Sequence, residues 1–250
     1  NVQRGGPGLG GIQPSQSDYF LATRGPGHGD FHVLVLAPAS VQEMADLTQK
    51  AFRLAFEYRM PAMLLADGTM GQMMEPVVLP EETVLEKSAP DWAVTGTECK
   101  RPHNIINSLY LTPNALEDLV RARYERYKIV EEKEQRAEEY RTEDADVIVV
   151  AYGASSRVAR SAVNKAREAG KKVGLIRPIT LWPFPKDAIK RAADHTKELL
   201  VVEMSMGQMV DDVRLAIHDQ KPVEFYGRTG GMIPSPAEVL GAVKKAGGVL

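Results

Sequence analysis

Cysteine is almost absent from this sequence, since Cys99 is the only one among 250 residues. A disulfide framework needs paired cysteines, and a zinc or iron–sulfur centre of the four-thiolate type needs four. The chain therefore holds neither an internal disulfide nor a complete thiolate cluster. Any electron-carrying cluster that works with this chain must lie on another chain.

An excess of charge of one sign and long apolar runs are also lacking. The 31 Lys and Arg residues nearly balance the 33 Asp and Glu residues, which leaves a formal net charge of -2 and no electrostatic footprint for nucleic acid or an anionic membrane. No apolar run approaches the roughly 20 residues that span a bilayer, and the start lacks the basic and apolar regions of a signal peptide. These features predict a soluble, cytoplasmic protein without nucleic-acid or membrane partners.

Glycine, in contrast, is concentrated at the start of the chain. Residues 1–30 are mostly glycine, proline and polar residues, which predicts a loop. Gly6 to Gly11 match the spacing G-x-G-x-x-G but neither follow a strand nor open a helix, so the pattern disfavours a dinucleotide site. The pattern G-x-x-x-x-G-K-[ST] is absent, which excludes an ATP-binding P-loop. Because the chain opens at Asn1 directly into this loop, we expect the front of its first domain to be missing.

Residues 32–67 have the pattern of a β-α-β unit. The run from His32 to Ala37 is short and nearly all apolar, as in a strand buried on both faces. Ser40 and Glu43 have the spacing of a capping box at the start of a helix. Pro61 to Asp67 predicts a second buried strand, which we expect to pair in parallel through a right-handed crossover.

The rest of the chain divides at about residue 146. Residues 76–145 are polar and broken by prolines, which predicts a surface connection ending in a charged, solvated helix over residues 114–140. Residues 146–250 alternate apolar runs with helical patterns, which predicts a parallel sheet covered by helices on both faces. We expect a tight turn over residues 153–156 before the first of these helices, and a final helix that starts at Ser235.

Two other patterns carry little functional signal. His28 and His32 bracket Asp30 at a spacing that could approach a metal ion, but no helix fixes their geometry, so ordinary loop histidines are favoured and no metal site is predicted. The segment Gly153 to Arg157 lies between a strand and a helix but differs from the G-x-S-x-G elbow of hydrolases. We interpret it as a structural turn.

An internal echo points to two possible interface or ligand loops. Residues 67–73 and residues 203–209 each begin with an acid at the end of a buried strand, followed four residues later by Gly-Gln-Met. The members of interest are Asp67, Gly71, Gln72, Glu203, Gly207 and Gln208. Open α/β sheets bind ligands at the carboxyl ends of their strands. A purely structural role, as convenient starts of helices, is about equally compatible with either loop.

Arg4 is the candidate for binding an anion. It is followed by Gly5 and Gly6, so an anion could approach its guanidinium without crowding, and the planar fork of that group suits a carboxylate. A loop arginine that only steadies its own turn remains the alternative.

The sequence resembles the substrate-binding subunit of 2-oxoacid:ferredoxin oxidoreductases. The resemblance covers nearly the whole chain, and its segments occur in the family order: residues 1–8 (Asn-Val-Gln-Arg-Gly-Gly-Pro-Gly), 27–30, 35–38, 177–185 (Arg-Pro-Ile-Thr-Leu-Trp-Pro-Phe-Pro), 202–208 and 226–231, which include Arg228. Residues 8–14 look closer to the branched-chain, 2-oxoisovalerate type than to the 2-oxoglutarate type, which usually has Ser-Thr-Gly after the proline.

The resemblance implies an α/β protein with three parts. These are the C-terminal part of a truncated thiamine-diphosphate pyrimidine domain (residues 1–75), a linker with a charged helix (76–145) and a transketolase C-terminal-like domain (146–250). It also implies coenzyme A-dependent oxidative decarboxylation of a 2-oxoacid, with electrons passing to ferredoxin. Thiamine diphosphate and magnesium would be shared with a partner subunit, and iron–sulfur clusters would lie on partner subunits only.

Within that resemblance, Arg4 takes the role of holding the substrate carboxylate, together with Gly5 and Gly6. No position matches the glutamate that activates the aminopyrimidine ring, and no Gly-Asp-Gly diphosphate motif is present. No catalytic residue is therefore assigned to this chain, which is expected to be inactive alone. Specificity for 2-oxoglutarate or another oxoacid, a transketolase-like enzyme and a non-catalytic assembly subunit remain as alternatives.

Overall fold

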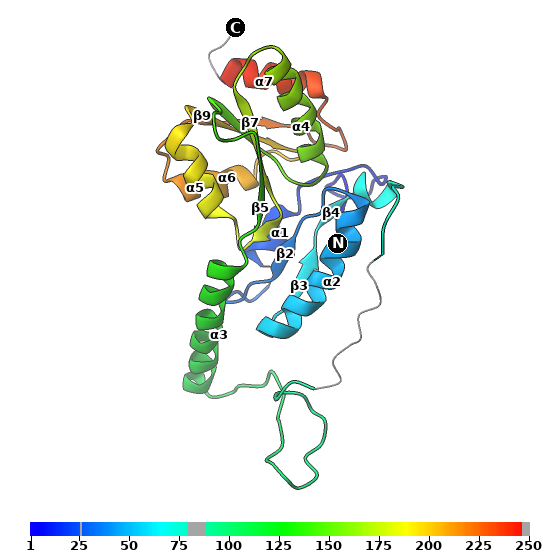
Figure 1. The fold of residues 1–250 in the computed structure, drawn as a ribbon. Helices are drawn as coiled ribbons and strands as arrows, with labels where there is room; N and C mark the ends of the chain where they lie inside the picture. Colours follow the sequence, from blue (N-terminus) through cyan, green and yellow to red (C-terminus); the bar gives the residue numbers. More distant parts are fainter. Residues whose placement is uncertain (26, 80–88, 247–250) are drawn as a thin grey trace.

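The computed structural model describes residues 1–25, 27–79 and 89–246 (Figure 1). Its largest sheet has five strands in the order β10 (Val223–Gly227), β9 (Glu198–Glu203), β6 (Val147–Val150), β7 (Val173–Pro178) and β5 (Ala137–Tyr140). The first four strands pair in parallel, and β5 pairs antiparallel with β7 at the edge. The predicted parallel sheet of the second half is therefore confirmed.

Helices cover both faces of this sheet, as its apolar strands require (Figure 1). α5 (Lys186–His195) and α6 (Met209–Ile217) pack on one face, while α4 (Gly153–Glu168) and α7 (Pro236–Ala246) pack on the other. The expected turn over residues 153–156 is wrong, since these residues form the first turn of α4. α7 begins with the predicted capping box: Ser235 Oγ accepts a hydrogen bond from the N–H of Glu238, whose carboxylate accepts one from the N–H of Ser235.

A second sheet of three strands contains the predicted β-α-β unit. β2 (Leu34–Leu36) pairs in parallel with β3 (Ala62–Leu64), and α2 (Val41–Tyr58) connects them. The third strand, β8 (Thr180–Trp182), comes from the second half of the chain and pairs antiparallel with β2. The two halves are therefore joined through a shared sheet, although their main sheets remain separate.

A short pair of strands lies beside this sheet and leads into the candidate site. β1 (Val2–Gln3) pairs in parallel with β4 (Ala66–Asp67), which is followed by the 3₁₀ turn η1 (Met70–Gln72). The single strand expected from Pro61 to Asp67 is thus split into β3 and β4, which belong to different sheets. α1 (Tyr19–Arg24) follows the loop that leaves β1.

The connection between the halves is mostly irregular but ends in regular structure. Residues 89–112 project from the body without helix or strand (Figure 1), and α3 (Pro113–Lys133) brings the chain back. The helix predicted over residues 114–140 is wrong at its end, because residues 137–140 form β5 and extend the large sheet. The division into residues 1–75, 76–145 and 146–250 stays a prediction, and residues 80–88 and 247–250 lie outside the described residues.

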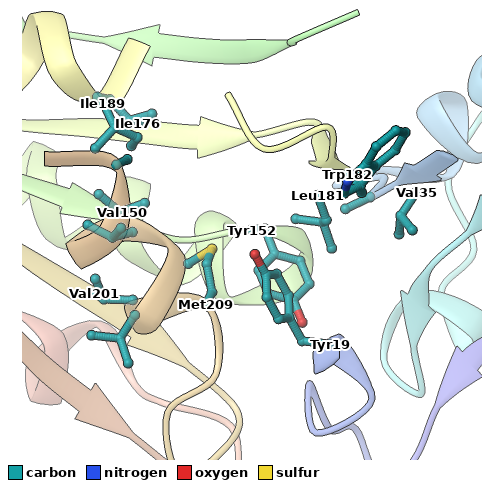
Figure 2. Close-up of a cluster of buried hydrophobic side chains, with 14 of the residues drawn as sticks. Tyr19, Val35, Val150, Tyr152, Ile176, Leu181, Trp182, Ile189, Val201 and Met209 are labelled. Atoms are coloured by element: carbon teal, nitrogen blue, oxygen red, sulfur yellow. The ribbon is translucent and has the colours of Figure 1, made fainter. Parts of the chain in front are cut away.

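The hydrophobic core runs without interruption between the two sheets (Figure 2). Val150, Ile176 and Val201 fill the α5 and α6 side of the large sheet, and the rings of Tyr152 and Tyr19 pack next to them, 5.9 Å between centroids. Beyond these tyrosines, Leu181 and Trp182 of β8 meet Val35 of β2; the full set is Tyr19, Val35, Val150, Tyr152, Ile176, Leu181, Trp182, Ile189, Val201 and Met209. In the described part of the chain, no helix is long and apolar enough to cross a lipid bilayer.

Candidate functional site

The loops at the carboxyl ends of β4, β6, β9 and β10 meet the N-terminal loop, which we define as residues 4–18. The N-terminal loop is closed at its base, because Arg4 and Pro14 form an antiparallel bridge and the N–H of Gly5 donates to the carbonyl of Gln13 over 2.7 Å. Gly5 and Gly231 approach so closely that a Cβ on Gly5 would lie 3.2 Å from the Gly231 nitrogen. Glycine on both sides permits this contact between loops more than 200 positions apart.

Gln16 fastens the N-terminal loop to the second half of the chain. Its side chain is completely buried, and its Nε2 donates to the carbonyl of Tyr152 over 2.9 Å. Its Oε1 accepts from Ser155 Oγ over 2.8 Å and from the N–H of Met204 over 2.9 Å. One amide therefore satisfies polar groups after both β6 and β9, which fixes the N-terminal loop above these two strand ends.

Asp67 ends β4 and caps two elements. Its Oδ1 accepts from the N–H groups of Thr69, at 2.9 Å, and Met70, at 3.2 Å, and its Oδ2 accepts from the N–H of Ala154 in the first turn of α4, at 3.3 Å. Burial raises the pKa of the Asp67 carboxyl above its ordinary value, and these backbone donors partly oppose that effect. The carboxylate is thus engaged in holding α4 against the first half.

Glu203, at the end of β9, likewise caps a helix N-terminus. Its carboxylate accepts from the N–H groups of Gln208, Met209 and Val210 at the start of α6, and from Ser205 Oγ over 2.9 Å. Burial raises the pKa of this completely buried carboxyl, and the same donors partly oppose the shift. Both acids of the internal echo therefore bind helix N-termini, where the N–H groups lack partners within the helix.

The glutamines of the two echoed segments form hydrogen bonds with opposite ends of the N-terminal loop. Gln72 Nε2 donates to the carbonyl of Ile12 over 3.0 Å, and Gln208 Nε2 donates to the carbonyl of Ser17 over 2.7 Å. Gln208 Oε1 also accepts from the N–H of Phe20 in α1 over 2.8 Å. The repeated pattern Gly-Gln-Met thus marks two supports of one loop.

The glycines of these segments allow close packing. A Cβ on Gly71 would lie 3.1 Å from Val2 Cγ1 of β1, and Gly207 adopts a φ of +102° beside Val210 and Phe225. Both positions therefore disfavour a larger residue, which keeps the echoed segments close to the strands that they follow.

Arg4 is exposed at the rim of this arrangement, between Gly6 and Gly10. Its Nη1 donates to the carbonyl of Gly5 over 2.8 Å. Among the described residues, Nε and Nη2 donate to no protein group, so one edge of the fork can receive a carboxylate through two parallel hydrogen bonds. Gly5 and Gly6 carry no side chain that would obstruct it.

Arg228 lies after β10, beside the same loops, but its side chain is already paired. The backbone N–H of Arg228 donates to the carbonyl of Glu203 over 3.1 Å, while the side-chain Nη1 forms an ion pair with Glu238 of α7. Of the two candidate arginines, Arg4 alone has a guanidinium that is directed to no carboxylate among the described residues.

The histidine pattern forms no metal centre in the described residues, among which no group of three or more His, Cys, Asp or Glu side chains could hold an ion. His32 instead stacks on Trp182, with ring centroids 4.4 Å apart, and meets the edge of Tyr127 at 5.1 Å. Burial lowers the pKa of His32. This aromatic cluster attaches α3 to β8.

The acids of the site do not fit the role of a group that protonates a cofactor ring. Both Asp67 and Glu203 are buried, and their oxygens accept hydrogen bonds from backbone N–H groups of their own loops and adjoining helices. A carboxyl that activates an aminopyrimidine has to present an oxygen to the ring nitrogen. We therefore derive no step through thiamine diphosphate from these two residues.

Sequence reasoning missed the residues that place the N-terminal loop most firmly. Gln16 stands in a polar run with no periodicity, so nothing in the sequence distinguishes it. Asp212 of α6 belongs to none of the sequence patterns described above, yet it accepts hydrogen bonds from Tyr19 over 2.5 Å and from Arg24 over 2.8 Å, which ties α1 to the second half. Asp212 is the fourth residue of α6, and an acid in the first turn of a helix is too common to indicate its partners.

Two family models match the chain and together cover almost all of it. Residues 1–151 match the model described as pyruvate flavodoxin/ferredoxin oxidoreductase, thiamine diphosphate-binding, and residues 145–239 match pyruvate:ferredoxin oxidoreductase core domain II. The expected α/β fold, with a thiamine-diphosphate-type domain followed by a second α/β domain, is thereby confirmed.

Curated relatives agree with this assignment. The ketoisovalerate oxidoreductase subunit VorB of Methanothermobacter thermautotrophicus is 46% identical over 248 residues, which cover 99% of this chain and 70% of that protein. The 2-oxoglutarate synthase subunit KorA of the same organism is 35% identical over 273 residues, covering 98% of this chain and 72% of that protein.

Solved structures share the fold. A 2-oxoglutarate:ferredoxin oxidoreductase from Magnetococcus marinus, with 2-oxoglutarate, coenzyme A and succinyl-CoA bound, superposes with a TM-score of 0.79 at 25% identity, over 98% of this chain and 47% of that one. A split-gene transketolase, 16% identical with a TM-score of 0.51 over 87% of this chain and 58% of that one, shares the fold alone. From the two family models and these relatives, we conclude that the chain belongs to the 2-oxoacid:ferredoxin oxidoreductase family, as an alpha-type subunit.

Proposed function

We propose that this chain holds the substrate in a complex that carries out coenzyme A-dependent oxidative decarboxylation of a branched-chain 2-oxoacid, with 2-oxoisovalerate favoured. The observation that carries the proposal is Arg4, on a glycine-flanked loop above the ends of parallel strands. One edge of its guanidinium donates to no protein group among the described residues. That edge matches the carboxylate shared by all 2-oxoacids. The identity of 46% to the ketoisovalerate subunit, against 35% to the 2-oxoglutarate subunit, supports the branched-chain assignment.

The remaining components are assigned to partner subunits. Thiamine diphosphate with magnesium would sit between this chain and a partner, since neither acid of the described site fits ring activation. Iron–sulfur clusters would lie on partners, because the single cysteine, Cys99, is exposed and cannot ligate a cluster alone. Ferredoxin would accept the electrons and coenzyme A the acyl group. A cytoplasmic location stays a prediction.

The substrate role of Arg4 is tested in the reconstituted complex with Arg4→Ala and Arg4→Lys. A charge-assisted pair contributes about 1.5–3 kcal/mol, so Arg4→Ala should lower kcat/KM roughly ten- to hundred-fold, and lysine should restore only part because it lacks the fork. Arg53→Ala, an exposed arginine on α2, is the matched control. Wild-type kcat/KM in Arg4→Ala would instead favour an arginine that steadies its own loop.

The same complex distinguishes the alternatives for the whole enzyme. Activity is measured with 2-oxoisovalerate, 2-oxoglutarate, pyruvate and indolepyruvate, with ferredoxin and with an artificial acceptor. Highest kcat/KM for 2-oxoglutarate would refute the branched-chain assignment. Activity that never depends on ferredoxin would favour a transketolase-like enzyme, and no dependence on any oxoacid would favour an assembly subunit.

A further inference from the structure

A cavity of about 550 Å³ lies where the segment that projects from the body meets α2 and α3 (Figure 1). This projecting segment, residues 89–112, forms one wall and α3 forms another, while Arg59, directly after α2, also lines the cavity. Of the described residues that line it, none belongs to the N-terminal loop. The volume falls within the range of about 300–1,000 Å³ that is typical of sites for small molecules.

The projecting segment is held in shape by its own hydrogen bonds. Asn104 Nδ2 donates to the carbonyl of Asp91 over 2.6 Å and to that of Ala93 over 2.9 Å, which joins the two sides of the segment. Trp92 attaches the segment to α2, since the centroid of its ring lies 5.9 Å from that of Phe56. This wall of the cavity is therefore formed without a ligand.

α3 presents one stripe of side chains to the cavity. They recur at intervals of three and four residues, which places them on one side of the helix: Leu116, Leu119, Arg123 and Arg126. Both arginines of the stripe are half-buried. The stripe therefore gives the cavity an apolar part and a basic part.

Three arginines, Arg59, Arg123 and Arg126, line this cavity without an acid. Among the described residues, no Asp or Glu lines the cavity, and none forms an ion pair with these three side chains. Arg123 Nη1 donates to the carbonyl of Asp30 over 3.2 Å, and the guanidinium of Arg59 lies 5.0 Å from the ring centroid of Trp92. Neither contact neutralises a charge. Because like charges around one cavity repel one another, a polyvalent anion between them is favoured.

We infer that this cavity binds a nucleoside diphosphate or triphosphate. The planar forks of the arginines match phosphate oxygens through paired hydrogen bonds, and a chain of two or more phosphates offers oxygens to more than one arginine at once. Trp92 and Tyr110 supply aromatic surface on which a base stacks. The inference does not depend on the substrate role of Arg4, because the residues that carry it lie outside the N-terminal loop.

The test is isothermal titration of ADP and of pyrophosphate into the reconstituted complex, with Arg123→Gln, Arg126→Gln and Trp92→Leu. Each arginine substitution removes charge-assisted hydrogen bonds, so the Kd of ADP should rise roughly ten-fold or more. Trp92→Leu should raise the Kd of ADP and leave that of pyrophosphate nearly unchanged, because pyrophosphate has no base. Arg121→Gln is the matched control, since Arg121 is exposed on the same helix and pairs with Glu117.

Other results overturn the inference. If ADP does not bind the wild-type complex at millimolar concentration, or binds Arg123→Gln and Arg126→Gln with the wild-type Kd, this cavity is not its site. Binding that coenzyme A abolishes and that these substitutions leave unchanged belongs to the site of the proposed function. Equal Kd values for ADP and pyrophosphate would exclude a nucleotide as the ligand.

Two outcomes concern the variants themselves. If Arg126→Gln prevents co-elution with the partner subunits, the arginines contact acids of a partner and the inference is wrong. If Arg126→Gln does not fold, Arg126→Lys decides the question, because lysine keeps the charge and lacks the fork. A wild-type Kd for ADP in Arg126→Lys would then overturn the inference.

Discussion

Replacing Gln16 by leucine should loosen the attachment of the N-terminal loop and lower both stability and activity. The change conserves approximate volume but removes three buried hydrogen bonds, to Tyr152, Ser155 and Met204. At about 1 kcal/mol net for each bond the loss is about 3 kcal/mol, and it is greater where the carbonyl of Tyr152 and the N–H of Met204 stay buried without partners. For a chain of this size, that corresponds to a fall in Tm of roughly 6–12 °C.

Calorimetry of the isolated chain and kcat/KM of the complex are the two assays. Gln49→Leu, at an exposed position of α2, controls for the substitution itself. A Tm for Gln16→Leu within 2 °C of that control, on the scale expected for surface substitutions, would refute the argument that this amide joins the halves. Lower stability with unchanged kcat/KM would separate the fold from the placement of Arg4.

A Gln16→Glu variant adds a pH dependence whose sign follows from the site. The new carboxyl would lie next to the Asp67 carboxyl, since Gln16 Nε2 and Asp67 Oδ2 are both within 3.5 Å of the Cβ position of Gly153. Burial and this like charge would raise its folded pKa above the unfolded value, as burial already does for Asp67. Its destabilisation should therefore be small near pH 5 and grow as pH rises, and equal losses of Tm at pH 5 and pH 8 would contradict this account.

Two further predictions concern groups outside the N-terminal loop. Arg177→Met leaves the carboxylate of Glu43 without its cation and leaves Glu138 paired with Arg160 alone. Because both carboxylates are about one-third exposed, the expected loss is about 2–3 kcal/mol, measured by chemical denaturation. Burial alone would raise the pKa of Glu138, but hydrogen bonds from Arg177 and Arg160 hold this pKa below its ordinary value. The pairing therefore stabilises the fold above about pH 4.5, and this stabilisation is lost on further acidification. The difference in stability between wild type and Arg177→Met should then shrink at pH 3, and a constant difference would argue against this account. Cys99→Ser should leave ferredoxin reduction by the complex unchanged, and a loss of electron transfer would implicate this exposed thiol.

The elements that the sequence predicted well are those with strong local patterns. The apolar, β-branched run at residues 147–150 and the capping box at Ser235 and Glu238 appear as expected, because each depends on neighbours within a few positions. β5 and β8 were not predicted as they occur. Ala137–Tyr140 carries charges that suit a helix, and its strand conformation comes from pairing with β7, which local propensity cannot reveal.

The candidate site divides in the same way. Arg4 and the two Gly-Gln-Met segments could be selected because glycine spacing and internal repetition are visible in one sequence. Their common purpose, to support one loop from two sides, depends on contacts between residues almost 200 positions apart, such as Gln208 with Ser17. Gln16 has no comparable signal, since an isolated glutamine in a polar run looks like any solvated residue.

The pairing of β8, from the second half of the chain, with β2 of the first half has a consequence for synthesis of the chain on the ribosome. Trp182, the partner of Val35 in the sheet, is synthesised roughly 150 residues after Val35. At about 5–20 residues per second this takes on the order of ten seconds or more. Until then one edge of β2 is unpaired, and such edges invite association with other chains. The nascent first half is therefore open to edge-to-edge association until β8 has been synthesised.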